Sequence, residues 1–200
     1  MAIGLIMGSI RPHRENADVS NWVLDILQET YPETDFELVD LKAYDLPLFK
    51  EPKSPGLTKH LEAPEAEAWL KKIKALTGYI FITPEYNHST SSALKNAIDY
   101  LSGQLIDKPV GIVSYGANGG QLAASQLREM LTEFQVADVS ENPTLDFDHD
   151  WQDKKFKPSA DAKDSVKVLG YQFMHWHDAM AQVRQAKAQE DTKQKGYKLD

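Results

Sequence analysis

Short apolar runs alternate along the chain with longer segments in which apolar residues recur every three or four positions. The runs are rich in leucine, β-branched and aromatic residues, a composition typical of buried strands. They lie at residues 2–7, 34–41, 78–83, 108–114 and 135–139. Helical spacing is found at residues 19–27, 66–73, 94–101, 123–134 and 166–183. Strands that alternate with helices predict an α/β fold, with a parallel sheet covered on both faces and right-handed crossovers.

A polar loop that begins with glycine follows the first run, from Gly8 to Asn16, and leads into the first predicted helix. A helix N-terminus presents free N–H groups and a partial positive charge, so this arrangement suits an anion such as phosphate. Gly8 permits close backbone approach, Ser9 offers a hydroxyl, Arg11 a bidentate fork and Asn16 an amide donor. The spacing is neither GxGxxG nor GxxxxGK[ST], so it indicates neither a dinucleotide fingerprint nor a P-loop. A strand-to-helix turn with solvated charges is the alternative interpretation.

A second polar loop follows the run at 78–83, at the strand end where open α/β sheets bind ligands. Pro84 ends the strand because it has no N–H for the ladder, and Ser89 or Ser91 caps the next helix. These structural roles do not explain the other side chains of the loop. On residue chemistry alone, a binding role for the loop and a purely structural role are equally open. The unexplained side chains are Glu85, Tyr86 and Asn87.

A third loop follows the run at 108–114 and again lies between a strand and a helix. It begins at Ser114 and Tyr115 and contains Gly116, Gly119 and Gly120. Taken alone, the glycines are more simply packing and turn residues than ligand contacts.

The second loop and the helix after it resemble the flavin-loop signature of the NAD(P)H-dependent FMN reductase family. The resemblance rests on the ordered motifs Pro84-Glu85-Tyr86-Asn87-His88-Ser89 and Leu94-Lys95-Asn96-Ala97-Ile98-Asp99. Ser91 and Ser92 depart from the family pattern, in which a Pro-Gly pair is common. The resemblance implies a flavodoxin-like three-layer sandwich with the sheet order 2-1-3-4-5, in which the three loops meet at one edge.

The family resemblance also implies a cofactor site for FMN. The first loop would hold the phosphate, the second would line the isoalloxazine ring, and the third would pack against its pyrimidine end and leave room for nicotinamide. Arg14 stands where the family often has serine, and either supplies charge in its place or points into solvent. The residues carried over as cofactor-binding are Ser9, Arg11, Asn16, Pro84, Glu85, Tyr86, Asn87, Ser89, Ser114, Tyr115, Gly116, Gly119 and Gly120.

The resemblance implies an enzyme, an FMN-dependent NAD(P)H oxidoreductase that passes electrons to a quinone, azo dye, flavin, nitroaromatic or metal oxyanion. Because the flavin carries the chemistry, we predict no catalytic nucleophile and no acid–base residue. The choice between NADH and NADPH stays open. The alternative is a flavodoxin-like electron carrier without NAD(P)H turnover, although flavodoxins normally lack an arginine such as Arg11; a flavin-free regulatory domain is a further alternative. The family is usually oligomeric, which implies a homodimer or homotetramer.

Composition narrows the remaining possibilities. The net charge of −8 disfavours a nucleic-acid partner, and the absence of cysteine excludes disulfides and thiolate chemistry. The first residues lack the basic region of a signal peptide, so we expect a cytoplasmic location without a membrane partner. Residues 1–187 are predicted to form one domain, followed by a polar, flexible tail at 188–200.

Three further segments carry weaker expectations. The acidic residues of 140–158 are interpreted as a solvated loop rather than a metal site, because the spacing is not that of an EF-hand. The connection at 42–64 is long enough to be functional or mobile, and the family has a similar segment near its dimer contact and flavin entrance. His175 and His177 are interpreted as structural or surface residues. An apolar stripe on the last helix is expected to pack on the sheet and consists of Val166, Leu169, Phe173, Trp176, Met180 and Val183.

Overall fold

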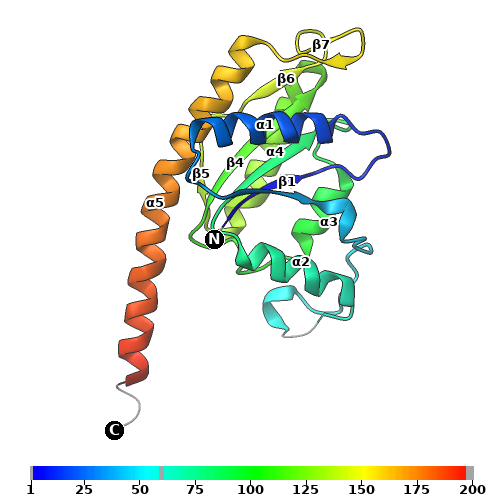
Figure 1. The fold of residues 1–200 in the computed structure, drawn as a ribbon. Helices are drawn as coiled ribbons and strands as arrows, with labels where there is room; N and C mark the ends of the chain where they lie inside the picture. Colours follow the sequence, from blue (N-terminus) through cyan, green and yellow to red (C-terminus); the bar gives the residue numbers. More distant parts are fainter. Residues whose placement is uncertain (1, 59–60, 197–200) are drawn as a thin grey trace.

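A parallel sheet forms the centre of the protein (Figure 1). The computed structural model describes residues 2–58 and 61–196, with side chains as far as residue 190. The strand order is β2-β1-β3-β4-β5, which confirms the predicted order. Its four long strands are β1 (Ile3–Met7), β2 (Phe36–Asp40), β3 (Tyr79–Pro84) and β4 (Pro109–Gly116).

The fifth strand differs from the prediction of one run at 135–139. The edge beside β4 is formed by β5 (Ala137–Asp138) and, after an interruption, by β6 (Thr144–Asp146), which pairs in parallel with the end of β4. Pro143 lies in the interruption, where it has no N–H for the ladder, while its carbonyl oxygen still accepts from Ser114 N at 3.0 Å. Most of the segment at 140–158 therefore belongs to the edge of the sheet or to a hairpin. The hairpin consists of β7 (Trp151–Gln152) and β8 (Lys155–Phe156).

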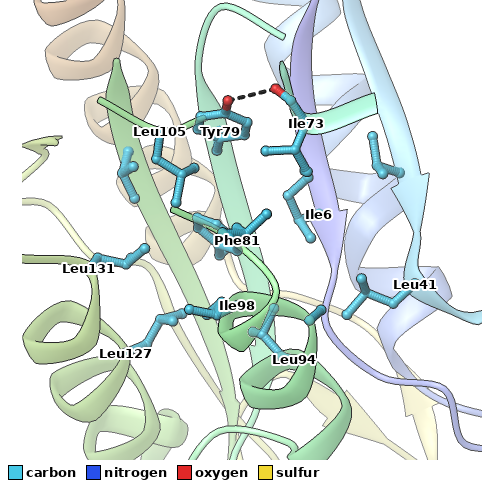
Figure 2. Packing of buried hydrophobic residues seen from close by; sticks show 14 of the residues in the cluster. Ile6, Leu41, Ile73, Tyr79, Phe81, Leu94, Ile98, Leu105, Leu127 and Leu131 are labelled. Atoms are coloured by element: carbon cyan, nitrogen blue, oxygen red, sulfur yellow. Dashed lines mark hydrogen bonds between the residues drawn. The ribbon is translucent and has the colours of Figure 1, made fainter. Parts of the chain in front are cut away.

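Helices cover both faces of the sheet, as the alternation of strands and helices predicts. Successive strand residues point to opposite faces, so that Phe81 packs in one core and Ile80 in the other. Figure 2 shows the first of these cores around Phe81. One face carries α2 (Pro64–Ala75), α3 (Ser92–Asp99) and α4 (Gln121–Leu131), and the other carries α1 (Asn16–Thr30) and α5 (Ala160–Gly196).

The first core contains a buried phenol at the start of β3. Tyr79 donates its hydroxyl proton to the carbonyl oxygen of Ile73 at 2.7 Å (Figure 2), and burial raises the pKa of this phenol. The ammonium of Lys108 donates to the same hydroxyl at 2.9 Å. Burial lowers the pKa of Lys108 to about 8, and the nearby cations Arg184 and Lys74 act in the same direction.

Helix α5 runs past the end of the sheet (Figure 1). Its apolar stripe packs on the sheet at Val166, Leu169 and Phe173, but the indole of Trp176 is 44% exposed, so the expectation that Trp176 packs on the sheet was wrong. The helix also continues through most of the tail predicted at 188–200, because alanine, glutamine, lysine and glutamate are strong helix formers even without an apolar face. Among the described residues, no helix combines the length and apolar character that a membrane span requires.

The long connection between β2 and α2 is fastened to α3 in its middle part. The side chain of Asn96 accepts from Phe49 N at 2.8 Å and donates to the carbonyl oxygen of Pro47 at 2.8 Å. The ring of Phe49 also meets Tyr100 edge to face at 5.1 Å. These contacts hold residues 47–49 against the helix that follows the second predicted loop.

Candidate functional site

The three predicted loops meet at the carboxyl edge of the sheet. We call them loop 1 (residues 8–15), loop 3 (85–91) and loop 4 (117–120), which follow β1, β3 and β4. The strands end together because Met7 pairs with Ile82 and Pro84 pairs with Tyr115. A cleft of about 320 Å³ lies between the loops. It is lined by Arg11, His13, Arg14, Glu15, Pro84, Glu85, Tyr86, Tyr115 and Phe147.

Loop 1 contributes a cation without a carboxylate partner. The guanidinium of Arg11 lies over the ring of Tyr86, 5.5 Å from its centroid, and among the described residues it forms no ion pair. The hydroxyl of Tyr86 lies 3.1 Å from the buried Ser9 Oγ. Arg11 is therefore exposed, charged and next to an aromatic wall of the cleft, which leaves its donors available for an anion.

Arg14 points inward. One of its terminal nitrogens donates to the carbonyl oxygen of Ser9 at 2.5 Å, and the other pairs with the carboxylate of Asp40 at the end of β2. Only 11% of the Arg14 side chain is exposed. Its charge is balanced by Asp40, and its structural effect is to fix the backbone of loop 1 at Ser9. Arg14 is therefore neither a solvated side chain nor a simple replacement for a phosphate-binding serine.

Asn16 uses its amide differently from the predicted role as a phosphate donor. The side chain is buried, and Nδ2 donates to the carbonyl oxygen of Ile82 at 3.0 Å, while Oδ1 has no hydrogen-bond partner in the described part of the chain. The free atom is an acceptor, so it suits a ligand hydroxyl or N–H better than a phosphate oxygen. Tyr115 lies nearby, and burial raises its pKa despite the opposing effect of the Asn16 amide, so the phenol is neutral at physiological pH.

The helix that follows loop 1 begins without a side-chain cap, unlike the helices that follow loops 3 and 4. Ser91 Oγ accepts from Leu94 N at 3.0 Å at the start of α3, which confirms Ser91 as the cap. Glu85 Oε2 accepts from Leu122 N at 3.0 Å and from Ala123 N at 3.2 Å at the start of α4. No described side chain caps the first turn of α1. Its N–H groups and partial positive charge are therefore the ones left for an anion.

Loop 3 forms a tight turn that directs two predicted residues away from the cleft. The backbone N–H of Tyr86 donates to the carbonyl oxygen of Ser89 at 2.8 Å, and the reverse hydrogen bond is 3.1 Å long. Asn87 and His88 lie at the exposed tip with φ of 51° and 65°, a conformation that asparagine adopts more readily than most residues. Neither Asn87 nor Ser89 lines the cleft beside Arg11. Ser89 instead lines a separate depression with α3 and α4.

Packing and backbone conformation require the glycines of loop 4. Gly119 and Gly120 have φ of 69° and 72°. A Cβ atom at Gly119 would lie 2.7 Å from the Cβ of Thr144, and one at Gly120 would lie 2.8 Å from Tyr115 N. Ser114 Oγ donates to the carbonyl oxygen of Gly119 at 2.9 Å. These contacts favour the structural interpretation of the glycines. The turn that they form packs against the backbone of Tyr115.

Sequence reasoning missed Phe147, His13 and Glu15 as cleft residues. Phe147 belongs to the segment interpreted as a solvated acidic loop, and the only local signal for it is an aromatic residue between two aspartates. That interpretation is corrected for Asp150, which is 4% exposed and accepts from the backbone N–H groups of Asp146 and Ser159, each at 2.9 Å. In the described part of the chain, no three histidine or acidic side chains are grouped to hold a metal ion.

The cleft combines the features that a planar, phosphorylated ring system requires. Arg11 and the uncapped start of α1 supply positive charge at one end. Tyr86 and Tyr115 supply aromatic walls. Asn16, which follows the cleft residue Glu15 but does not itself line the cleft, carries a buried acceptor oxygen that has no partner among the described residues. The donor set fits FMN.

Comparisons with known proteins identify relatives that are named as FMN reductases. The family model described as NADPH-dependent FMN reductase matches residues 1–150. The NAD(P)H-dependent FMN reductase ntnL of Nectria sp. is 40% identical over 134 residues, which are 64% of this chain and 66% of that protein. The NAD(P)H-dependent FMN reductase C4B3.06c of Schizosaccharomyces pombe is 35% identical, with 73% of each chain covered.

A solved structure shares the fold. It is that of FerB, a flavoenzyme NAD(P)H:(acceptor) oxidoreductase from Paracoccus denitrificans, with a TM-score of 0.61 and 21% identity over 90% of this chain and 97% of that one. At this level of identity the likeness concerns the fold alone, and it supports a flavodoxin-like architecture together with the observed strand order.

Proposed function

Because this chain belongs to the NADPH-dependent FMN reductase family and is an FMN-dependent NAD(P)H oxidoreductase, we propose that the cleft between loops 1, 3 and 4 is its FMN site. The observation that carries the proposal is the coincidence of two unsatisfied positive groups at one end of an aromatic cleft. These are the guanidinium of Arg11 and the uncapped N-terminus of α1.

Each element of the cleft has a part in binding. Arg11 and the first N–H groups of α1 hold the phosphate, and Asn16 Oδ1 accepts from a hydroxyl of the ribityl chain. Tyr86 and Tyr115 flank the ring system, and Ser9 fixes the Tyr86 hydroxyl. The remaining proposed residues act mainly by holding the loops that present these groups. They are Pro84, Glu85, Asn87, Ser89, Ser114, Gly116, Gly119 and Gly120.

Bound FMN would supply the redox chemistry, taking electrons from NAD(P)H and giving them to an acceptor. The protein's own residues bind and orient the cofactor and need no nucleophile. For the acceptor we propose a small aromatic oxidant, such as a quinone, azo dye or nitroaromatic, with free flavin and metal oxyanions as further candidates. Relatives support the first two, since one from Bacillus is named NADPH azoreductase and one from Arabidopsis thaliana is named NADPH:quinone oxidoreductase.

The electron-carrier alternative is not favoured, because these relatives are named as enzymes that use NAD(P)H. We further propose that the protein is a cytoplasmic homodimer or homotetramer, as is usual in the family. Light scattering at micromolar concentration tests the assembly, and a monomer would contradict it.

The function is tested by purifying the protein with FMN and recording its visible flavin spectrum. NADH and NADPH oxidation is then measured against a panel of quinone, azo, nitroaromatic and oxyanion acceptors. Steady turnover with one of the nucleotides is expected, and a flavin-loaded protein that turns over with neither nucleotide would refute the assignment.

Arg11→Ala tests the site itself. Loss of a charged hydrogen-bonding group should weaken FMN binding by about 1.5–3 kcal/mol, or roughly ten- to a hundredfold in Kd. The matched control is Lys167→Ala, which removes an exposed cation of α5 that forms an ion pair with Asp164. FMN affinity unchanged in Arg11→Ala, measured by fluorescence titration, would remove the phosphate assignment.

A further inference from the structure

The segment after β6 forms one wall of the cleft that loops 1, 3 and 4 do not provide. We call residues 147–156 the arm. The arm is fixed to the sheet edge because Phe147 N donates to the carbonyl oxygen of Gly116 at 3.3 Å. Its turn is closed by the buried Asp150, whose carboxylate accepts from the backbone N–H groups of Asp146 and Ser159. The arm is therefore a braced element and not a loose loop.

The arm exposes an aromatic ring at the cleft. The side chain of Phe147 is 43% exposed and lines the cleft together with Tyr86 and Tyr115. Its ring meets Trp151 edge to face at 4.9 Å and lies 6.4 Å from Tyr115. A large apolar side chain that is held in place on one side and left open on the side of a cleft is available for contact with a ligand.

A row of aromatic residues supports Phe147 from behind. Trp151 contacts Phe156 at 4.8 Å, and Phe156 meets Trp22 of α1 at 5.5 Å. The indole N–H of Trp151 donates to Glu15 Oε2 at 2.9 Å, which ties the arm to loop 1. The β7–β8 hairpin that provides Trp151 and Phe156 lies beyond residues 1–150, the span matched by the family model. The position of Phe147 thus depends on a part of the chain outside that match.

We propose that Phe147 is a specificity-determining residue, whose ring contacts the planar ring of an aromatic electron acceptor and favours two-ring quinones over non-aromatic oxidants. Aromatic rings attract each other in offset-stacked and edge-to-face geometries, and the cleft offers such a surface beside the exposed cation of Arg11. In the reaction, NAD(P)H and a proton reduce the quinone to the quinol and leave NAD(P)⁺, so two electrons are transferred. The inference rests on the proposed function, because the acceptor is reduced at this site.

The test compares Phe147→Leu with Phe156→Leu in the FMN-loaded enzyme. Both changes replace a ring by a branched apolar side chain in the same aromatic row, but only Phe147 lines the cleft. KM and kcat are measured with menadione, a two-ring quinone, and with ferricyanide, which has no ring. In Phe147→Leu we expect KM for menadione to rise about two- to tenfold, the range of an aromatic pair contact. KM for ferricyanide, KM for NAD(P)H and the Kd for FMN should stay at the wild-type values in both variants. Phe156→Leu removes only support behind Phe147 and should raise KM for menadione less than Phe147→Leu does.

Three results would overturn the proposal. An unchanged KM for menadione in Phe147→Leu would show that the ring does not contact the quinone. A weaker FMN affinity would place Phe147 against the cofactor, and an equal rise in KM with ferricyanide or NAD(P)H would make its effect nonspecific. Failure of the proposed function is distinguishable, since the wild-type enzyme would then oxidise NAD(P)H with neither acceptor.

Discussion

Replacing Glu85 should destabilise the fold and loosen loop 4 together, because one carboxylate oxygen joins loop 3 to the start of α4. Glu85 Oε2 accepts from Leu122 N and Ala123 N, and its own backbone N–H donates to the carbonyl oxygen of Tyr115 at 2.9 Å. Gly116 lies directly against it, since a Cβ atom built there would be 3.2 Å from the Cβ of Glu85. The side chain thus replaces the cap that Gly120 cannot supply.

The magnitude follows from the two hydrogen bonds and the charge. Loss of a side-chain cap costs about 1 kcal/mol on average, and a carboxylate at a helix N-terminus contributes a further ~0.3–1 kcal/mol. Glu85 is partly exposed, so water can replace part of what is lost. Glu85→Ala should therefore lower the free energy of unfolding by about 1–2 kcal/mol. Glu85→Gln keeps an acceptor oxygen without the charge and should lose about half as much.

Urea unfolding followed by tryptophan fluorescence measures these changes. Glu129→Ala is the matched control, because it removes an exposed carboxylate from the other end of α4, where a negative charge is unfavourable. The control should be neutral or slightly stabilising. FMN affinity should fall in Glu85→Ala, since loop 4 and Tyr115 lose their brace. Equal stability of Glu85→Ala and wild type would refute the capping role, and a loss in Glu129→Ala as large as in Glu85→Ala would show that charge position is irrelevant.

Three further changes test other parts of the site and core. Gly120→Ala should cost at least about 2 kcal/mol in thermal unfolding, because φ is 72° and the new methyl would meet the backbone of Tyr115; wild-type stability would contradict this. Burial lowers the pKa of Lys108 to about 8 from 10.5, so between these values the unfolded chain binds more protons and the free energy of unfolding should rise with pH. Lys108→Met should make this rise smaller when the free energy of unfolding is measured by urea titration at pH 8 and at pH 10. The same rise in the variant and the wild type would refute the role of Lys108. Asp40→Asn should lower stability by about 1–3 kcal/mol, because it leaves the largely buried Arg14 without its carboxylate; no loss in urea unfolding would contradict the pairing.

Much of the fold follows from periodicity and resemblance, because both report on long segments. The parallel sheet with helices on both faces was predicted from the placement of short apolar runs. The resemblance added the strand order and, with it, the convergence of three loops at one edge. The fifth strand was predicted as one run because the apolar pattern ends at Val139. The short strand at Thr144–Asp146 is formed through pairing with β4, and no local pattern of three residues reports on such pairing. Trp176 shows a similar limit, because a helical stripe indicates which face is apolar but not where the sheet beneath it ends.

The roles of the site residues were also only partly predictable from the sequence. Arg11 and Arg14 are the same residue type, three positions apart in one loop, and the sequence offers no local reason to give them different roles. The difference arises from Asp40, which ends β2 beside β1 because the strand order places those two strands together. One arginine is thereby balanced and holds the Ser9 carbonyl, while the other keeps its charge for the cleft. Assigning the two roles requires the strand order first and the side-chain geometry second, so a motif that names both arginines can predict an anion site without saying which of them binds the anion.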